Sequence, residues 1–283
     1  MKMENNPDIV AVEEKEEKKV GKDALLVAGA IILGSVIVAS ALFFLSSKVA
    51  VAPTKEADKV VVPAAAAVPP GAKVTVTMDQ IKALFNDKNL AFGDKNSQVL
   101  FVEFSDPSCP YCHAAAGKNA SLNKQMGPQF TLISDGGTYL APVPEMKKLV
   151  DTGKAGFVWM YANGHGNGEM GTKALYCAKE KGKFWEAHDL IMSEAGYNLI
   201  NTDIKNDKTK SGALANFLKS AVNAVDMKTC LDSGKYDNRL TDDMNVARQF
   251  GFSGTPDFFV NTDNFVGAIS FKDIQPIVEK YLK

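Results

Sequence analysis

Val99-Leu100-Phe101-Val102-Glu103-Phe104 is an apolar run that predicts a buried strand, and after a turn at residues 105–108 it leads into Cys109-Pro110-Tyr111-Cys112. Pro110 suits the first position of a helix, where its missing N–H has no intrahelical partner, and Ala114-Ala115-Ala116 continues that helix. Two sulfurs at this spacing can close a small disulfide ring, and a helix N-terminus stabilises a thiolate. The stretch therefore predicts a strand, a turn and a helix that begins at a reactive cysteine pair.

The cysteine pair alone is compatible with three kinds of site. It can be a redox dithiol, one half of a zinc site completed by Cys177, Cys230 or histidines, or, because His113 extends it to C-x-x-C-H, a covalent haem attachment site. The preceding strand disfavours the haem site, and the wide spacing of Cys177 and Cys230 disfavours zinc. A domain that keeps the fold but only binds other proteins is a further alternative, against which the intact cysteine pair argues.

The length and charge of the chain limit the classes of protein to consider. At 283 residues and a net charge of -1, one globular domain of about 200 residues with attachments is expected. No basic block is present, so a nucleic-acid partner is not expected. Residues 24–47 carry no charge and exceed the roughly 20 apolar residues that a membrane span needs. We expect a retained single-pass anchor rather than a buried helix or a signal peptide cleaved near Ala39-Ser40-Ala41.

The lysines around this span predict its orientation. The flank before the span carries Lys15, Lys18, Lys19 and Lys22, whereas lysines are sparser after it. The N-terminus is therefore expected on the cytoplasmic side of the cell membrane, and the part of the chain after the span on the outer side. An even number of cysteines in such an oxidising compartment suggests pairs. The predicted organisation is a charged cytoplasmic tail at 1–23, the transmembrane anchor at 24–47, an Ala- and Pro-rich tether at 48–72 and a folded domain at 73–283.

Strand and helix patterns alternate along the folded part. They predict strands at 74–76, 99–104 and 156–161, helices at 78–85, 145–150, 171–181, 183–193, 213–222 and 236–250, a hairpin of 258–260 and 265–269 with a turn at 261–264, and a final helix opened by Ser270 and Asp273. This order predicts an α/β fold: a thioredoxin-like sheet with a helical insertion at about 166–250. The stretch Gly117–Pro144 is longer than such a fold needs, and a loop or short hairpin is expected there, near the site.

Four motifs in this order resemble those of the bacterial DsbA-type thiol–disulfide oxidoreductases, in their membrane-anchored branch. The motifs are Val102–His113, Cys177–Asp189, Cys230–Tyr236 and Gly254-Thr255-Pro256, and the resemblance covers about residues 74–283. It implies an enzyme that exchanges disulfides with secreted or envelope proteins, as an oxidant. An isomerase or reductase with the same site is the alternative, because Pro-Tyr between the cysteines differs from the Pro-His of the strongest oxidants in this family.

The resemblance also implies the roles of the catalytic residues. Cys109 would be the exposed nucleophile with a lowered thiol pKa, and Cys112 the resolving thiol. Pro256 would be cis and lie against the sulfurs, so that the backbone of Thr255 can pair with an extended substrate. Glu103 would be a buried acid that exchanges a proton with Cys112; an inward-leaning ion-pair partner is the alternative.

The remaining cysteines and the residues beside the pair complete the expectations. Pro110, Tyr111 and His113 are expected to tune the site, with His113 on the surface of its helix. Cys177 and Cys230 are expected to form a structural disulfide, as the family resemblance implies; free buried thiols are the alternative.

The redox group and the partners follow from the same resemblance. No metal is expected, and no cofactor other than the redox-active disulfide itself. The expected partners are cysteine-containing extracytoplasmic proteins and a membrane redox partner that resets the dithiol. A separate dimerisation domain is missing from the pattern, so a monomer is expected.

Overall fold

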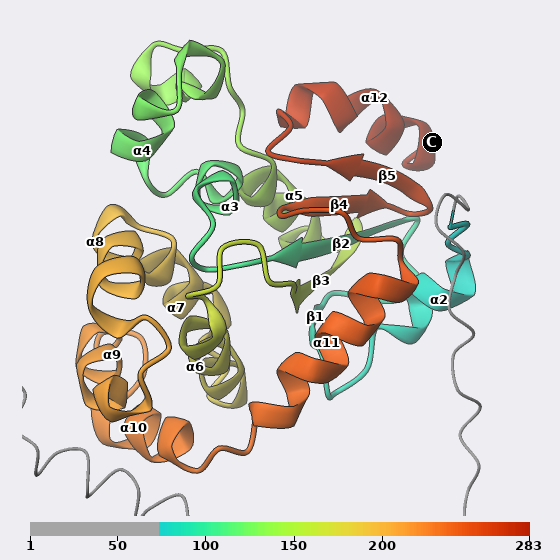
Figure 1. Ribbon diagram of the computed structural model, residues 1–283. Helices are drawn as coiled ribbons and strands as arrows, with labels where there is room; N and C mark the ends of the chain where they lie inside the picture. Colours follow the sequence, from blue (N-terminus) through green and yellow to red (C-terminus); the bar gives the residue numbers. More distant parts are fainter. Residues whose placement is uncertain (1–73) are drawn as a thin grey trace, which may run out of the picture. The chain divides into compact units, whose positions relative to one another are not determined.

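A five-stranded mixed sheet runs through residues 74–283, the part of the chain that this computed structural model describes (Figure 1). The strand order is β1-β3-β2-β4-β5, with β2 and β3 parallel and the other neighbours antiparallel. The strands are β1 Leu90–Phe92, β2 Val99–Ser105, β3 Ala155–Tyr161, β4 Asp257–Val260 and β5 Asp263–Val266. This mixed sheet, covered by helices, confirms the predicted thioredoxin-like α/β fold.

The predicted tail, membrane anchor and tether at 1–72 lie outside the described residues. Within residues 74–283, no helix combines the length and the apolar character that crossing a membrane requires.

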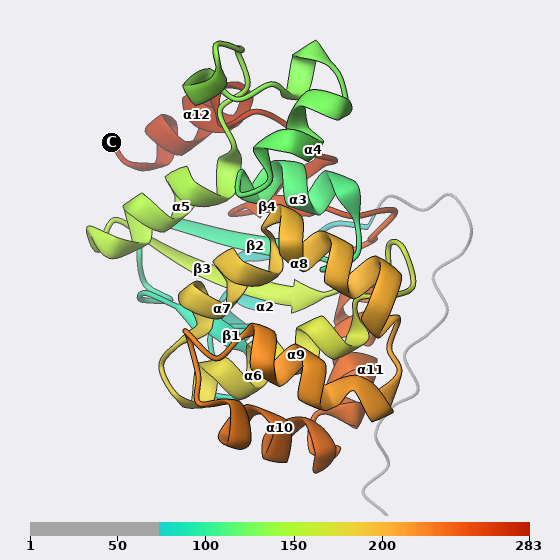
Figure 2. The same cartoon turned by 90° about the vertical axis from the view of Figure 1, so that its left-hand side faces the viewer.

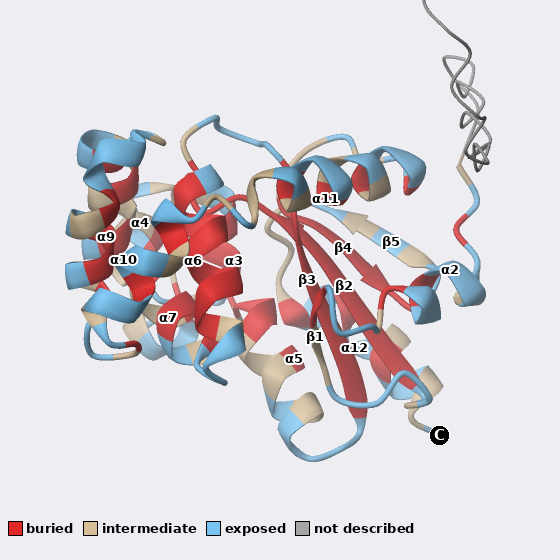
Figure 3. Cartoon of the chain, turned by 90° about the horizontal axis from the view of Figure 1, so that it is seen from below, coloured by how far each residue is buried: buried red, intermediate tan, exposed pale blue. Residues whose placement is uncertain are grey.

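Helices pack on both faces of the sheet. They are α2 Met78–Ala83, α3 Pro110–Ala116, α4 Ala120–Gln125, α5 Pro142–Asp151, α6 Glu169–Glu180, α7 Phe184–Ile191, α8 Glu194–Asn198, α9 Ser211–Phe217, α10 Ala224–Asp232, α11 Asp237–Gln249 and α12 Phe271–Tyr281. Seen from below, α11 and α12 lie on opposite sides of the buried strands (Figure 3). The helical block of α6 to α10 lies beside α3, as the view turned by 90° shows (Figure 2).

Strand β2 is the centre of the core, and all seven of its residues are buried. Because successive side chains of a strand point to opposite faces, β2 contributes to two separate clusters. Leu100, Val102 and Phe104 pack with residues of α2 and α11. Phe101 lies on the other face, in the larger cluster that also contains both cysteines of the CxxC pair and residues of α5, α6, α7 and α12. Glu103 lies on that same face.

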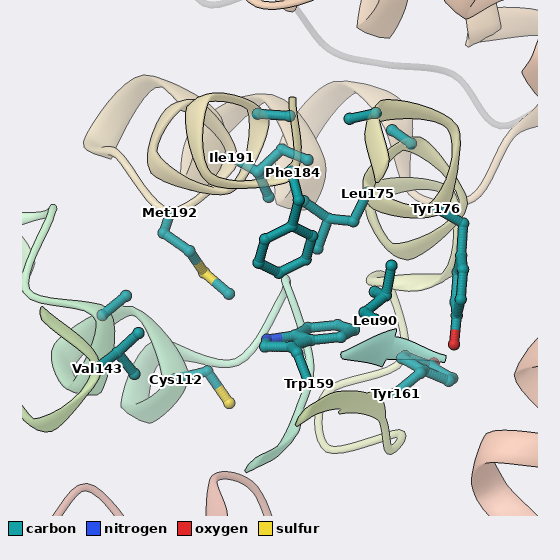
Figure 4. Close-up of a cluster of buried hydrophobic side chains, with 14 of the residues drawn as sticks. Leu90, Cys112, Val143, Trp159, Tyr161, Leu175, Tyr176, Phe184, Ile191 and Met192 are labelled. Carbon is teal, nitrogen blue, oxygen red and sulfur yellow. The ribbon is translucent and has the colours of Figure 1, made fainter. Parts of the chain in front are cut away.

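The larger cluster is built around Trp159 of β3. The close-up shows its indole beneath Phe184 of α7, with Leu175 of α6 and Ile191 nearby (Figure 4). The rings of Trp159 and Phe184 are 6.4 Å apart between centroids, in an edge-to-face arrangement that aromatic pairs prefer. This packing attaches the helical block to the sheet.

Three local predictions were wrong. Val74–Val76 is not a strand: Val76 is buried by side-chain packing near α2 and α11, while β1, unpredicted, supplies the edge strand that pairs with β3. The second strand of the hairpin begins at Asp263, because Asn261 adopts a left-handed φ of 51° and turns the chain at once. Residues 117–144 hold the helix α4, the start of α5 and short 3₁₀ turns instead of a simple loop or hairpin.

The helical block contains elements that the sequence pattern did not indicate. The predicted insertion at about 166–250 corresponds to α6 to α11, but α8, a π-helical turn at Leu199–Ile204 and α10 were missed. Cys177 in α6 and Cys230 in α10 form a disulfide across this block, with their Cα atoms 6.0 Å apart. The alternative of free buried thiols does not apply to this pair.

The disulfide generates a prediction about stability. It joins residues 53 apart in sequence, and on the chain-entropy model a closed loop of this length stabilises the native state by about 4 kcal/mol. Replacing both Cys177 and Cys230 by Ala should therefore lower the free energy of unfolding by about that amount in a urea titration. As a control, mild reductant should open the CxxC disulfide of the unchanged protein and leave this bond closed in a mass-spectrometric map. Alkylated Cys177 or Cys230 in protein isolated under oxidising conditions would contradict the pairing.

Candidate functional site

The cysteine pair lies where the central strand passes into α3. Cys109 is the residue that precedes the helix, with extended backbone angles of φ -82° and ψ 125°, and Pro110 takes the first helical position as predicted. The backbone N–H groups of His113 and Cys112 both donate to the Cys109 carbonyl oxygen. Helix α3 ends at Gly117, whose φ of 64° suits glycine. The site is therefore held at the N-terminal end of a short helix whose five residues from Cys112 to Ala116 are all buried.

The buried carboxylate of Asp106 holds the turn in front of this helix. One oxygen accepts hydrogen bonds from the N–H (2.8 Å) and the hydroxyl (2.6 Å) of Ser108. The other accepts from the N–H groups of Gly164 and His165, each at 2.8 Å, in the loop that follows β3. Gly168 is required there, because a Cβ at this position would lie 1.9 Å from the Asp106 carboxylate. Sequence reasoning missed Asp106, although an Asp-Pro pair between a strand and a cysteine motif is a recognisable turn signal.

The Thr255–Pro256 peptide bond is cis and lies at the site, as expected from the resemblance. The Cys109 thiol donates to the Thr255 carbonyl oxygen at 3.5 Å, although the two residues are 146 positions apart. The fold therefore brings the Gly254-Thr255-Pro256 motif against the first cysteine.

The two thiols of the pair differ in their pKa values. The pKa of the Cys109 thiol is lowered to about 6, chiefly by a hydrogen bond from the Cys112 thiol. Thr255 and backbone N–H groups of α3 lower this pKa further, whereas burial acts in the opposite direction. Burial and the neighbouring Cys109 raise the pKa of Cys112 well above its ordinary value. Cys109 is thus the thiol that ionises first.

Cys109 is not as exposed as expected. Only 3% of its surface is accessible, because the residue lies at the base of α3 with the Thr255 carbonyl directly against it.

Glu103 is fully buried on the face of β2 that α3 covers, and burial raises the pKa of its carboxyl to about 8. Within residues 74–283 neither carboxyl oxygen has an ion-pair partner or a hydrogen bond of full geometry, and the Ser105 hydroxyl, two residues along the same face of β2, opposes the effect of burial on this pKa. The alternative of an ion-pair partner is therefore not seen in this part of the chain. Cys112, in contrast, accepts a hydrogen bond from the Asp106 N–H at 3.3 Å.

His113 is not a surface residue. It is fully buried, and its ring nitrogens lie 2.9 Å from the carbonyl oxygens of Met192 and Pro107. The reason is that the helical block covers this side of α3, which a helix pattern alone does not reveal. Burial lowers the pKa of His113 to about 4. With both ring nitrogens facing backbone carbonyls, His113 does not present a nitrogen to a haem iron.

Tyr111, between the cysteines, is the exposed residue of the motif, with 47% of its surface accessible. Its ring packs edge-to-face on Phe130, with the centroids 5.8 Å apart, and Phe130 packs in the same way on Tyr139 at 5.7 Å. The segment between α3 and α5 therefore does lie beside the site, as expected. No group of three or more His, Cys, Asp or Glu side chains within residues 74–283 is arranged to hold a metal ion.

Comparisons with known proteins agree with this geometry. The sequence profile of the family described as Thioredoxin matches residues 143–280. Putative protein-disulfide oxidoreductases of Rickettsia prowazekii and Rickettsia felis are 25% and 26% identical to the chain, over 74% and 75% of its length. A Na(+)/H(+) antiporter of Salinispora tropica is also 25% identical, over 62% of this chain. The chain spans only 22% of the antiporter and 65% and 64% of the two rickettsial proteins.

Solved structures share the fold. The thiol-disulfide exchange protein alpha-DsbA2 of Wolbachia pipientis superposes with a TM-score of 0.51 at 19% identity, covering 72% of this chain and 95% of that protein. This likeness shows the thioredoxin-like fold, and the named rickettsial relatives are in line with the resemblance that the four motifs indicate.

The difference between the two thiols generates a prediction. In the reduced protein, the rate at which iodoacetamide modifies Cys109 should rise with pH around a midpoint of about 6, because the thiolate is the reacting form. Cys112 should stay unmodified through this range, because its pKa is raised. Peptide mass mapping of samples quenched at each pH measures both, with free cysteine, whose pKa is about 8.5, as the reference. A midpoint for Cys109 close to that of free cysteine would contradict the assignment.

Proposed function

We propose that this protein, whose folded domain resembles the DsbA type, is a membrane-tethered thiol–disulfide oxidoreductase that exchanges disulfides with extracytoplasmic proteins through Cys109 and Cys112. The observation that carries the proposal is the Cys109 thiol, with its pKa lowered to about 6, lying 3.5 Å from the carbonyl oxygen of Thr255 before a cis proline. A reactive thiol beside an available backbone segment is what disulfide exchange with a polypeptide requires.

The exchange proceeds in two steps. A substrate thiolate attacks the sulfur of Cys109 in the Cys109–Cys112 disulfide, so that the bond between the two cysteines breaks and Cys112 leaves as a thiolate that takes up a proton. A second substrate thiolate then attacks the substrate sulfur of the mixed disulfide, and Cys109 leaves as a thiolate. The substrate has lost two electrons and gained a disulfide, and the enzyme holds them as a dithiol.

Thr255 is proposed to bind the substrate through its backbone. An extended segment can add to exposed main-chain groups as an extra strand, which binds without a strong demand on sequence. Because the Thr255 carbonyl also touches Cys109, a segment bound there would bring its own cysteine to the reactive sulfur.

The direction of electron flow is proposed to be oxidation of the substrate. A low pKa of Cys109 stabilises the reduced enzyme at neutral pH, and a stabilised reduced form makes a dithiol pair more oxidising. Equilibration of the Cys109–Cys112 pair with glutathione buffers measures its reduction potential directly. A potential near that of thioredoxin, about -270 mV, would favour the reductase alternative instead.

The cellular setting is proposed from the sequence. The uncharged run at 24–47 would anchor the chain with its N-terminus inside, and the tether at 48–72 would hold the domain on the outer side of the cell membrane. A membrane redox partner would reoxidise the dithiol. The redox group of the proposed reaction is the cysteine pair itself. We propose that the domain acts as a monomer and that it does not bind nucleic acid.

Single cysteine substitutions test the proposed chemistry. Cys109→Ser should abolish exchange with a thiol substrate, because the attacked sulfur is lost. Cys112→Ser should accumulate mixed disulfides at Cys109, because the internal resolving thiol is missing. Non-reducing electrophoresis with a peptide supplied as its disulfide measures both, because the Cys109 thiolate of Cys112→Ser attacks that disulfide, forms the mixed disulfide and releases the other peptide sulfur as a thiolate. The Cys177→Ala/Cys230→Ala double variant, assayed where it is folded, should still exchange. A Cys112→Ser protein that forms no adduct would show that Cys109 is not the nucleophile.

The proposed topology has its own test. A protease that cannot cross membranes, added to spheroplasts, should digest the domain at 73–283 while a cytoplasmic marker stays intact. N-terminal sequencing of the membrane-bound protein should find the start of the chain. A domain that resists the protease until the membrane is dissolved would place it inside, and a mature protein beginning near Leu42 would exclude the retained anchor.

A further inference from the structure

Glu103 lies in a row of four residues that crosses the sheet. Its strand neighbours are Trp159 on β3 and Phe258 on β4, and Trp159 is in turn opposite Leu90 on β1. All four residues have no accessible surface. Because neighbouring strands lie about 4.7–4.9 Å apart, the side chain of Glu103 projects from β2 between those of Trp159 and Phe258.

Of the residues in this row, only Trp159 carries a polar side-chain atom besides Glu103, and the buried hydroxyl of Ser105 lies two residues along β2 on the same face. Its indole Nε1 is buried and has no hydrogen-bond partner within residues 74–283, and the same is true of both carboxyl oxygens of Glu103. Indole N–H is a donor only, and an ionised carboxylate is an acceptor only. Figure 4 shows the nitrogen on the edge of the ring that faces the Cys112 side, away from Leu90. The unpaired indole N–H of Trp159 and the unpaired carboxyl of Glu103 therefore lie on neighbouring strands, β3 and β2, at paired positions. Buried polar groups of this kind are almost always hydrogen-bonded in protein cores.

We propose that the indole N–H of Trp159 donates to the Glu103 carboxylate and so maintains the charged form of this acid on the face where Cys112 is buried. Trp159 is then a positioning residue for proton exchange, and this inference rests on the proposed disulfide-exchange function. Burial raises the pKa of Glu103 to about 8, against which the Ser105 hydroxyl acts. Because a hydrogen bond to the charged form favours ionisation, a bond from the indole would act in the same direction as Ser105.

The proton-exchange step needs the charged acid. When Cys109 is held in a mixed disulfide, the Glu103 carboxylate takes the proton of the Cys112 thiol. The Cys112 thiolate then attacks the sulfur of Cys109, the bond from Cys109 to the substrate sulfur breaks, and the substrate leaves as a thiolate. The indole keeps its own proton throughout.

In a pH profile, the titration of Glu103 has to be distinguished from the titration of other ionisable groups nearby. The buried ones on the surrounding elements are Asp106 after β2, Cys109, Cys112 and His113 at α3, Tyr139 before α5, Tyr161 of β3, Lys173 and Tyr176 of α6, and His188 of α7. Burial, with Glu103 and then Asp273 nearby, raises the pKa of Tyr139, so this phenol stays neutral in the working range. A readout that observes the glutamate carboxyl itself avoids the ambiguity.

The test compares two tryptophan substitutions in the reduced full-length chain labelled with ¹³C at glutamate carboxyls. The chain contains two tryptophans, so Trp185→Phe is the matched control for Trp159→Phe. The signal missing in Glu103→Gln identifies the resonance of Glu103. Trp159→Phe should raise the titration midpoint of that resonance by roughly one pH unit, a tenfold change in the ionisation equilibrium, while Trp185→Phe should leave it in place. An unchanged midpoint in Trp159→Phe, or an equal shift in the control, overturns the proposal.

A second variant covers the case in which Trp159→Phe does not fold. In the Trp185→Phe background, growth with 3-benzothienylalanine exchanges the single remaining indole N–H for sulfur at nearly constant shape, and the same upward shift is expected. In both variants the release of substrate from a Cys109 mixed disulfide should slow by about tenfold at pH 7 and recover at higher pH. If the protein exchanges no disulfides at all, the proposed function fails, whereas the carboxyl titration still decides whether Trp159 acts on Glu103.

Discussion

The buried carboxylate of Asp106 is the contact on which the geometry of the site depends. It accepts four hydrogen bonds, two from Ser108 in the turn before α3 and two from the backbone of Gly164 and His165 after β3. Burying a charged carboxylate is costly unless hydrogen bonds use its acceptor capacity, and here those bonds join the ends of two neighbouring parallel strands. Gly164 in turn lies directly against the Thr255 side chain, where a Cβ would come within 1.7 Å of the hydroxyl. The turn, the loop and the cis-proline segment are thus held as one unit around Cys109.

Within this unit, one short helix gives two cysteines opposite properties. Cys109 stands at the helix start, where hydrogen bonds from Cys112, Thr255 and the backbone favour its thiolate. Cys112, one turn further, is buried next to that charge and remains a thiol. The proposed roles of Cys109 as the leaving thiolate and Cys112 as the resolving thiol would follow from their different depths along α3, since the residue type is the same.

The helical block supports the site from outside the sheet. The carbonyl of Met192, at the end of α7, faces the ring of His113 and so ties the cysteine helix to the block. At the far side, Asp243 of α11 accepts hydrogen bonds from the Tyr176 hydroxyl and from the backbone of Tyr161, which attaches α11 to α6 and β3. Together with the disulfide between α6 and α10, these contacts attach the insertion to α3 and to the sheet.

The sequence by itself determined the central strand, the cysteine helix and the order of the main elements, because these depend on local patterns: an apolar run, a proline at a helix start, a glycine at a helix end. The family resemblance added the roles expected of Cys109, Cys112, Glu103 and Pro256, which remain predictions of function. Tertiary structure alone decided that Val76 is buried without joining the sheet and that His113 is enclosed by α7. It also decided that Trp159 stands across from Glu103. Pairing between strands and burial beneath distant helices join residues tens of positions apart, and no local pattern encodes which partner a side chain will meet.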